Sequence, residues 1–333
     1  MNQPAPLQPG DRVRMVAASS ALIGAAALAR LDAGISVLEG WGLEVERTPL
    51  PGRCWGYLAG RDQERRGDLE AAARWGADLL ACVRGGWGAA RLLEQPLSLS
   101  CRWLLGFSDV TSLLWAQLAQ GHGGAVHGPL LTTLAAEPAW SKERLRAVLF
   151  GEPLAPLQGE VWVGGSSKGP LLAANLTVAT HLLGTPHLPD LRGAILVLED
   201  VGEAPYRIER MLTHWRLCGA LQQLGGIGLG MFSDCDGQSG GEIAKQALTD
   251  RSTLGATTAQ QVEGRDGFTL EQVLRERTAD LGIPVVAGLP VGHGAGNAAL
   301  PLGALAELDG HSGLLRISPD RRLACSRARL SPP

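Results

Sequence analysis

A strong charge bias is absent from this chain. Its 333 residues carry 30 Lys and Arg against 33 Asp and Glu, a formal net charge of −3, and charges of one sign form no long run. A nucleic-acid-binding protein needs a basic footprint, so we expect no nucleic-acid partner. The local cluster of Arg61, Arg65 and Arg66 is interpreted as the solvated face of a helix.

Long apolar runs are also absent. Hydrophobic residues make up 45% of the sequence, but no uninterrupted apolar stretch reaches the roughly 18 residues that a membrane span needs. We therefore expect no membrane partner. Arg12 and Arg14 precede an apolar stretch, 15–24, in a pattern that imitates a secretory signal. Because residues 28–41 continue as an amphipathic helix, we favour an internal strand over a cleaved signal.

Cysteine pairs of the C-x-x-C kind are missing. Six cysteines are scattered at positions 54, 82, 101, 218, 235 and 325, and several lie in or beside apolar segments. This favours buried thiols over a disulfide framework and predicts a cytoplasmic location. His122 and His127 lack a Cys or carboxylate at metal-ligand spacing, which favours a structural or substrate-lining role over a metal site. The glycine-rich stretch 225–230 is interpreted as a strand and not as a dinucleotide loop, so no metal and no cofactor are expected.

What is present is an alternation of strand-like and helix-like runs. It occupies residues 1–135 and predicts an α/β domain with a parallel, flavodoxin-like sheet. Residues 136–169 are rich in proline and glycine and are interpreted as a linker. Residues 170–333 are expected to form a smaller mixed α/β domain rich in β structure. Within it, 236–267 is interpreted as either a lid or a disordered excursion.

Local patterns place several elements in the second domain. A helix is expected from Pro205 to about Cys218, and another begins at Thr269 with Gln272 placed for a capping box. Short apolar pieces around residues 310–313 predict a terminal hairpin.

The most informative segment is an apolar run that ends at Ser108 and Asp109. Residues 103–107 predict a short strand, and apolar residues recur at helical spacing from 110 to 118. A serine at such a corner is placed like a nucleophile, and the unpaired N–H groups of the first helical turn are suited to hold an oxyanion. The second glycine of the usual G-x-S-x-G elbow is missing. A capping role for Ser108 explains this segment equally well.

Further candidates lie at the ends of other predicted strands. Residues 79–83 form a buried strand pattern that breaks into the glycine-rich stretch 84–88, where the backbone can approach a ligand closely. An apolar run ends at Glu199, and His293 lies among glycines. From these residues alone, we favour the interpretation of Glu199 as an ordinary strand-end carboxylate and of His293 as an ordinary loop histidine.

Eight segments together carry a specific resemblance. They are residues 10–13, 84–91, 106–111, 127–129, 175–176, 184–186, 198–207 and 292–294. In their order and in their coverage of nearly the whole chain they resemble the LD-carboxypeptidase family of serine peptidases. This family includes muramoyltetrapeptide carboxypeptidases and microcin-immunity hydrolases.

The resemblance implies a Ser-Glu-His triad at Ser108, Glu199 and His293. Imidazole titrates near neutrality, so His293 suits the role of base for Ser108, and Glu199 would orient the imidazole. The N–H groups of Asp109 and Gly86 are the expected oxyanion donors, with Gly86 preferred over Gly85. Because the serine and the other two residues fall in different predicted domains, the site is expected at their interface.

The substrate follows from the resemblance and not from the residues. It implies a small muropeptide from which the terminal D-alanine is removed during cell-wall recycling, and a homodimer. Arg84, Gly85 and Trp87 are the candidate substrate contacts, with Arg84 able to clamp a carboxylate. Two alternatives stay open: a microcin-immunity type of amide hydrolase acting on aminoacyl-nucleotide conjugates, and a catalytically silent binding protein on the same scaffold.

Overall fold

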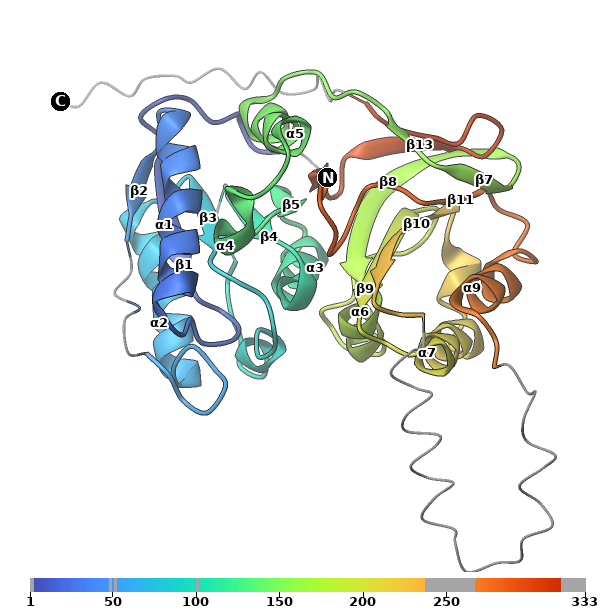
Figure 1. The fold of residues 1–333 in the computed structure, drawn as a ribbon, viewed down its shortest axis with the longest axis horizontal. Helices are drawn as coiled ribbons and strands as arrows, with labels where there is room; N and C mark the ends of the chain where they lie inside the picture. Colours follow the sequence, from blue (N-terminus) through green and yellow to red (C-terminus); the bar gives the residue numbers. More distant parts are fainter. Residues whose placement is uncertain (1–2, 48–49, 51–52, 100–101, 237–266, 319–333) are drawn as a thin grey trace, which may run out of the picture.

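Two β-sheets lie side by side in this protein (Figure 1). The computed structural model describes residues 3–47, 50, 53–99, 102–236 and 267–318. Helix α3 (Thr111–Ala119) lies between the two sheets and contacts both β5 of the first and β8 of the second.

The first sheet is parallel except at one edge. Its strand order is β2-β1-β3-β4-β5, with the short antiparallel strand β12 beside β5. This is the flavodoxin-like order, so the α/β fold class predicted from the sequence is confirmed. The strands are β1 (Arg12–Val16), β2 (Glu44–Glu46), β3 (Leu79–Cys82), β4 (Trp103–Gly106), β5 (Ala125–His127) and β12 (Leu300–Pro301).

Helices cover both faces of this sheet, which is why β3 and β4 are apolar at every buried position. Leu79 of β3 packs into the apolar cluster that contains Leu31 and Ile35, whereas the next residue, Leu80, faces the cluster of Leu113 on the opposite side. Alternate residues of a strand point to opposite faces. The helical segments are α1 (Ala25–Gly40), α2 (Asp62–Trp75), η1 (Ala90–Leu93), η2 (Ser108–Val110), α3, α4 (Leu131–Leu134) and α5 (Ala139–Phe150).

The second sheet is mixed. Its order is β6-β14-β13-β8-β9-β10-β11-β7; the pairs β8–β9, β9–β10 and β10–β11 are parallel and the other pairs formed by its outer strands are antiparallel. The strands are β6 (Leu157–Gln158), β7 (Glu160–Val163), β8 (Ser166–Asn175), β9 (Ile195–Val201), β10 (Gly226–Ser233), β11 (Val285–Ala287), β13 (Leu305–Asp309) and β14 (Leu314–Ile317). The predicted glycine-rich strand and terminal hairpin are thus confirmed as β10 and β13–β14.

The helices of this half are α6 (Leu176–Leu182), α7 (Pro205–Leu217), η3 (Leu221–Gln223) and α9 (Leu270–Thr278). The predicted capping box is present at the start of α9. The Thr269 hydroxyl accepts from Gln272 N at 3.2 Å, and the Gln272 side chain accepts from Thr269 N at 2.8 Å. Most of the segment 236–267, interpreted as a lid or a disordered excursion, lies outside the described residues.

The stretch 136–169, interpreted from its composition as a linker, is largely structured. It contains α5, β6, β7 and the start of β8, and β12 returns from the C-terminal half to pair with the first sheet. The domain boundaries at 135 and 170 stay predictions.

The two halves share one continuous apolar core. Within it, the Trp115 indole of α3 donates to Ala173 O of β8 at 3.0 Å and lies edge-on to Trp215, with ring centroids 6.3 Å apart. Thr111 Oγ1, at the start of α3, accepts from Asn175 N at 3.2 Å. These buried contacts fix α3 against the second sheet.

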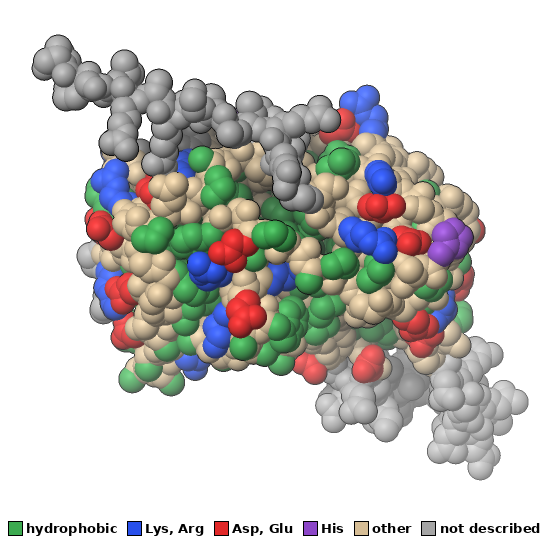
Figure 2. All heavy atoms as spheres, turned by 90° about the horizontal axis from the view of Figure 1, so that it is seen from above, with side chains coloured by type: hydrophobic (Ala, Val, Ile, Leu, Met, Phe, Trp, Pro, Cys, Tyr) green, Lys and Arg blue, Asp and Glu red, His purple; other side chains and the backbone are tan. Residues whose placement is uncertain are grey.

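Charged side chains of both signs are interspersed on the coloured face that Figure 2 shows. Among the described residues, no helix is both long and apolar enough to cross a membrane. Among the described cysteines, Cys82 and Cys235 are buried as expected, whereas Cys54 and Cys218 are exposed.

Candidate functional site

Ser108 lies at a strained corner between β4 and α3. Its φ of +62° is in the left-handed region, which a non-glycine residue adopts at a cost of about 1–3 kcal/mol and which clusters at functional sites. Neither η2 nor α3 has a side-chain cap. The hydroxyl instead bonds to His293, so the interpretation of Ser108 as a helix cap is wrong.

Three side chains form a chain of hydrogen bonds. His293 Nε2 is 3.0 Å from Ser108 Oγ, and His293 Nδ1 is 2.6 Å from Glu199 Oε2. When Glu199 is ionised it accepts the proton of Nδ1, which leaves Nε2 free to accept from the serine hydroxyl. The structure thus brings together the three residues that the resemblance singled out, from opposite halves of the molecule.

Glu199 lies fully buried in the last part of β9. Burial raises the pKa of its carboxyl, while the hydrogen bond to His293 acts in the opposite direction. The next residue, Asp200, faces elsewhere: it accepts from Asn175 Nδ2 at 2.9 Å and from Thr177 N at 2.9 Å. The two consecutive carboxylates therefore have different partners. Glu199 binds the imidazole, whereas Asp200 holds the start of α6.

His293 belongs to the irregular segment between β11 and β12, here named the histidine loop (residues 288–299). Its neighbour Gly292 has a φ of +128°, and a Cβ there would lie 2.9 Å from Glu199 Cβ. Only glycine fits this position without strain. The imidazole also packs against Phe107, with ring centroids 4.7 Å apart.

The glycine-rich stretch 84–88 crosses directly over the corner formed by Ser108 and Asp109, here named the elbow. A Cβ on Gly85 would lie 2.9 Å from Ser108 Cβ and 3.7 Å from Asp109 N, so the absence of a side chain allows this approach. The buried Asp109 carboxylate accepts from Ala89 N at 2.8 Å, which ties the stretch to the elbow. Burial raises the pKa of Asp109. The oxyanion roles of the Asp109 and Gly86 amides stay predictions.

The candidate substrate contacts lie around the same stretch. Arg84 Nη1 donates to Ala21 O at 2.9 Å and thereby braces the loop after β1. Trp87 is 41% exposed and is not a core aromatic. The backbone N–H of Trp87 donates to Ser20 Oγ at 3.0 Å. Of the three candidates, the structure shows Gly85 against Ser108. Contact of any of them with a substrate stays a prediction.

His127 is one of the two histidines for which the sequence favours a structural or substrate-lining role over a metal site. It is fully buried at the end of β5, where it pairs with Gly106, and neither ring nitrogen has a hydrogen-bond partner. Burial lowers its pKa to about 3, so the ring is neutral at physiological pH. Among the described residues, no three His, Cys, Asp or Glu side chains cluster as metal ligands.

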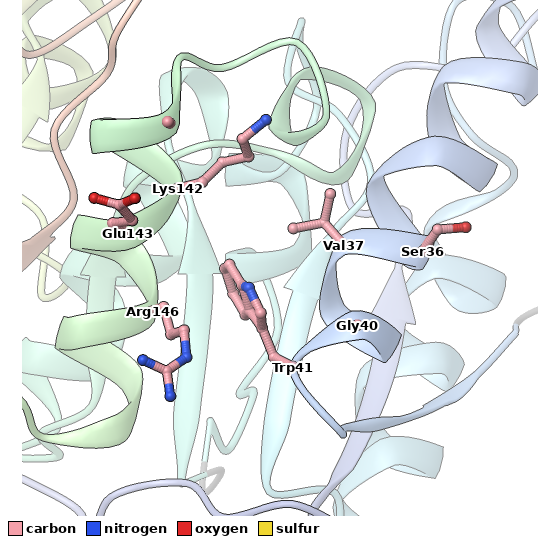
Figure 3. A pocket seen from close by; sticks show the side chains of 8 residues that line it. Ser36, Val37, Gly40, Trp41, Lys142, Glu143 and Arg146 are labelled. Atoms are coloured by element: carbon pink, nitrogen blue, oxygen red, sulfur yellow. The ribbon is translucent and has the colours of Figure 1, made fainter.

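The surface pocket of Figure 3 is a separate feature. Its volume is about 340 Å³, and it lies between α1 and α5, lined by residues that include Trp41, Glu143 and Arg146. It shares no residue with the hydrogen-bonded chain at Ser108.

Sequence reasoning missed the residues that hold the histidine loop, above all Glu137 and Asn297. Both are buried polar residues. Glu137 lies in the stretch interpreted as a linker, and no local pattern relates it to a loop 160 residues away.

Comparisons with known proteins identify the family. Residues 13–128 match the family model described as the LD-carboxypeptidase N-terminal domain, and residues 168–308 match the model of its C-terminal domain. A Synechocystis protein that is provisionally named a carboxypeptidase is 47% identical over 94% of this chain and 96% of its own length. The murein tetrapeptide carboxypeptidase of Pseudomonas aeruginosa is 35% identical over 91% of this chain and 95% of its own.

Solved structures share the fold. The muramoyltetrapeptide carboxypeptidase of Oxalobacter formigenes superposes with a TM-score of 0.74 at 26% identity, covering 92% of this chain and 97% of that one. The microcin C7 self-immunity protein in complex with aspartyl sulfamoyl adenosine gives a TM-score of 0.74 at 20% identity, covering 96% and 98%. At that identity the likeness shows the fold alone. The two family models cover more than two thirds of the sequence, and the chain belongs to the LD-carboxypeptidase family.

Proposed function

We propose that the protein is a serine LD-carboxypeptidase that releases the terminal D-alanine from murein tetrapeptides in cell-wall recycling. The observation that carries the proposal is the hydrogen-bonded chain from Ser108 through His293 to Glu199. The 35% identity to the Pseudomonas aeruginosa murein tetrapeptide carboxypeptidase supports the choice of substrate.

The proposed reaction has two halves. In the first, Ser108 Oγ attacks the carbonyl carbon of the scissile bond while His293 Nε2 takes its proton, and Glu199 stabilises the imidazolium that forms. The tetrahedral intermediate places its negative oxygen against the amides of Asp109 and Gly86. When it collapses, His293 protonates the departing D-alanine amine and the peptide remains as an ester of Ser108.

In the second half, water attacks the ester. His293 accepts a proton from this water and returns one to Ser108 Oγ, which releases the shortened peptide and restores the enzyme. Neither half requires a metal ion or a cofactor. Arg84 is proposed to bind the terminal carboxylate of the substrate, because a guanidinium can pair with a carboxylate through two hydrogen bonds.

The proposal includes a cytoplasmic location and a homodimer. The free thiols of Cys54, Cys218 and Cys235 support a reducing compartment. The homodimer rests on the family resemblance alone.

A second candidate is an amide hydrolase of the microcin-immunity type. The fold that this chain shares with the microcin C7 self-immunity protein is compatible with this alternative. The same triad serves either substrate, since both reactions break an amide bond through an acyl-enzyme.

One incubation separates the candidates. Purified protein is mixed with an L-Ala-D-Glu-diamino acid-D-Ala tetrapeptide, with and without chelator, and products are identified by mass spectrometry. We expect D-alanine release that the chelator does not change. An intact tetrapeptide together with cleavage of an aminoacyl-nucleotide amide would replace the carboxypeptidase assignment by the alternative. If neither is cleaved, the binding-protein alternative is favoured.

A further inference from the structure

The turn between α4 and α5 reaches across to the histidine loop. Glu137 Oε2 accepts from Gly296 N at 3.1 Å and from Asn297 N at 2.9 Å. The Glu137 side chain is buried, at 9% exposure. A carboxylate that accepts two backbone N–H groups away from water makes strong, charge-assisted hydrogen bonds.

Neighbouring contacts reinforce this attachment. Ser141 Oγ of α5 donates to Asn297 O at 2.9 Å, and Trp140 packs so closely on Gly296 that a Cβ there would lie 2.3 Å from its ring. The Asn297 side chain then accepts from Gly292 N at 3.0 Å. Glu137 therefore holds one end of a short connection that leads to the residue before His293.

One buried apolar cluster joins the strand before Ser108 to the two helices on either side of Glu137. Leu131 and Leu134 of α4 and Leu145 of α5 pack in one buried cluster with Leu105, which lies three residues before Ser108. In contrast, β11 lies in the second sheet and β12 in the first, so the histidine loop crosses from one half to the other. The contact with Glu199 ties His293 to the second half. The distance from His293 to Ser108 therefore also depends on how the histidine loop is attached to the first half.

We propose that Glu137 is a positioning residue that sets His293 against Ser108, a role that rests on the triad of the proposed function. It contacts neither the substrate nor the reacting atoms. It acts by fixing the backbone at residues 296–297 to the half of the molecule that carries the serine.

The test uses Glu137→Ala in the full chain and two readouts that need no natural substrate. The first is the rate at which a fluorophosphonate forms a bond from Ser108 Oγ to phosphorus, with loss of fluoride and transfer of the serine proton to His293. We expect this rate to fall by on the order of 10- to 100-fold, because small misplacements of a catalytic group have effects of that size. The second is the low-field proton NMR signal of the His293 Nδ1–H held by Glu199, which we expect to broaden or move.

Two further variants separate positioning from folding. Glu137→Gln keeps an acceptor oxygen and should label within about fivefold of wild type, since a neutral acceptor still forms both bonds, more weakly. Glu143→Ala, on the exposed side of the adjacent helix α5, should match wild type in both readouts. If Glu137→Ala does not fold, Ser141→Ala carries the test, with an expected loss of about 2- to 10-fold.

Unchanged labelling and an unchanged low-field signal in folded Glu137→Ala would overturn the proposal, as would equal losses in the Ala and Gln variants. Failure of the proposed function looks different. Wild-type protein that labels at Ser108 but leaves the tetrapeptide intact loses its substrate assignment and keeps the positioning role. Wild-type protein that does not label loses the triad and the positioning role together.

Discussion

The two sides of the site are built in different ways. Ser108 is held by regular structure: β4 ends one residue before Phe107, and the strained corner leads directly into η2 and α3. His293 is held by an irregular loop whose attachments come from far along the chain, from Glu199 in β9 and from Glu137 beside α5.

The position of Ser108 is therefore set by residues close to it in the sequence, whereas the position of His293 is set by residues far from it. The strand-to-helix junction fixes the serine side through backbone conformation that a few consecutive residues determine. The histidine side depends on buried hydrogen bonds between residues that are 94 to 160 positions apart. We therefore expect substitutions on the two sides to have different effects on activity and on the free energy of unfolding.

The largest expected effect comes from the chemistry that both sides share. Ser108→Ala should lower hydrolysis by a factor on the order of 10⁴ to 10⁶, as should His293→Ala, because the members of a triad act as a unit. For the same reason, the double variant should be no worse than either single one. Turnover is measured on the tetrapeptide, with circular dichroism as the control for folding. Losses that multiply in the double variant would contradict a shared mechanism.

Two glycine substitutions test the serine side and the histidine side separately. Gly85→Ala places a Cβ against Ser108 and should cost on the order of 100-fold in activity by displacing the stretch over the elbow. Gly292→Ala adds backbone strain at φ +128° to a close approach to Glu199. It should lower the free energy of unfolding by about 1–3 kcal/mol as well as the activity.

Chemical denaturation and steady-state rates of the two glycine variants check this prediction. A Gly292→Ala variant with wild-type stability, or a Gly85→Ala variant with wild-type activity, would break the contrast between the two sides.

A third effect concerns pH and the serine side. The pKa of His127 is lowered to about 3 in the folded protein, against 6.5 for an unperturbed histidine, so the unfolded chain binds an extra proton between these values. The contribution of His127 to the free energy of unfolding is fully present at higher pH and is lost as the pH falls below about 6.5. Between pH 7 and pH 5 this loss amounts to about 2 kcal/mol. Burial raises the pKa values of Glu199 and Asp109, which act in the opposite direction.

His127→Leu should therefore flatten the decline in unfolding free energy between pH 7 and pH 5, measured by urea denaturation at each pH. A variant whose decline equals that of wild type would show that His127 is not the group responsible.

The smallest expected effect lies at the contact between the halves. Thr111→Val removes the hydroxyl that accepts from the buried Asn175 N and leaves that donor unpaired, at a cost of about 1–3 kcal/mol in unfolding free energy. Activity per folded molecule should fall less than in the glycine variants, because the Ser108 corner itself is unchanged. Melting temperature and active-site titration measure the two effects. A variant as inactive as Gly85→Ala would show that the elbow depends on this contact.

The features that could be predicted from the sequence are those set by residues that are adjacent in the chain. The alternation of apolar runs was enough for the parallel first sheet, and the Thr269 capping box and the β13–β14 hairpin were correct because a few adjacent residues specify them. The strained corner at Ser108 was indicated by a strand pattern that meets a helix pattern.

The attachments of the histidine loop could not be predicted in this way. The composition of residues 136–169 indicated a linker, and nothing local distinguishes Glu137 from a surface carboxylate. Its burial arises only when α5 packs against the crossing from β11 to β12. The pairing of Glu199 with His293 came from the family resemblance, since residue types alone favoured ordinary roles for both.

The most direct test of the account is peptide mapping after fluorophosphonate treatment of wild-type protein and of His293→Ala. We expect one adduct in the wild type, on Ser108, and none on this residue in the variant, because the serine there lacks its base. An adduct on another residue, or equal labelling of Ser108 in both proteins, would contradict the claim that the two halves assemble a working triad.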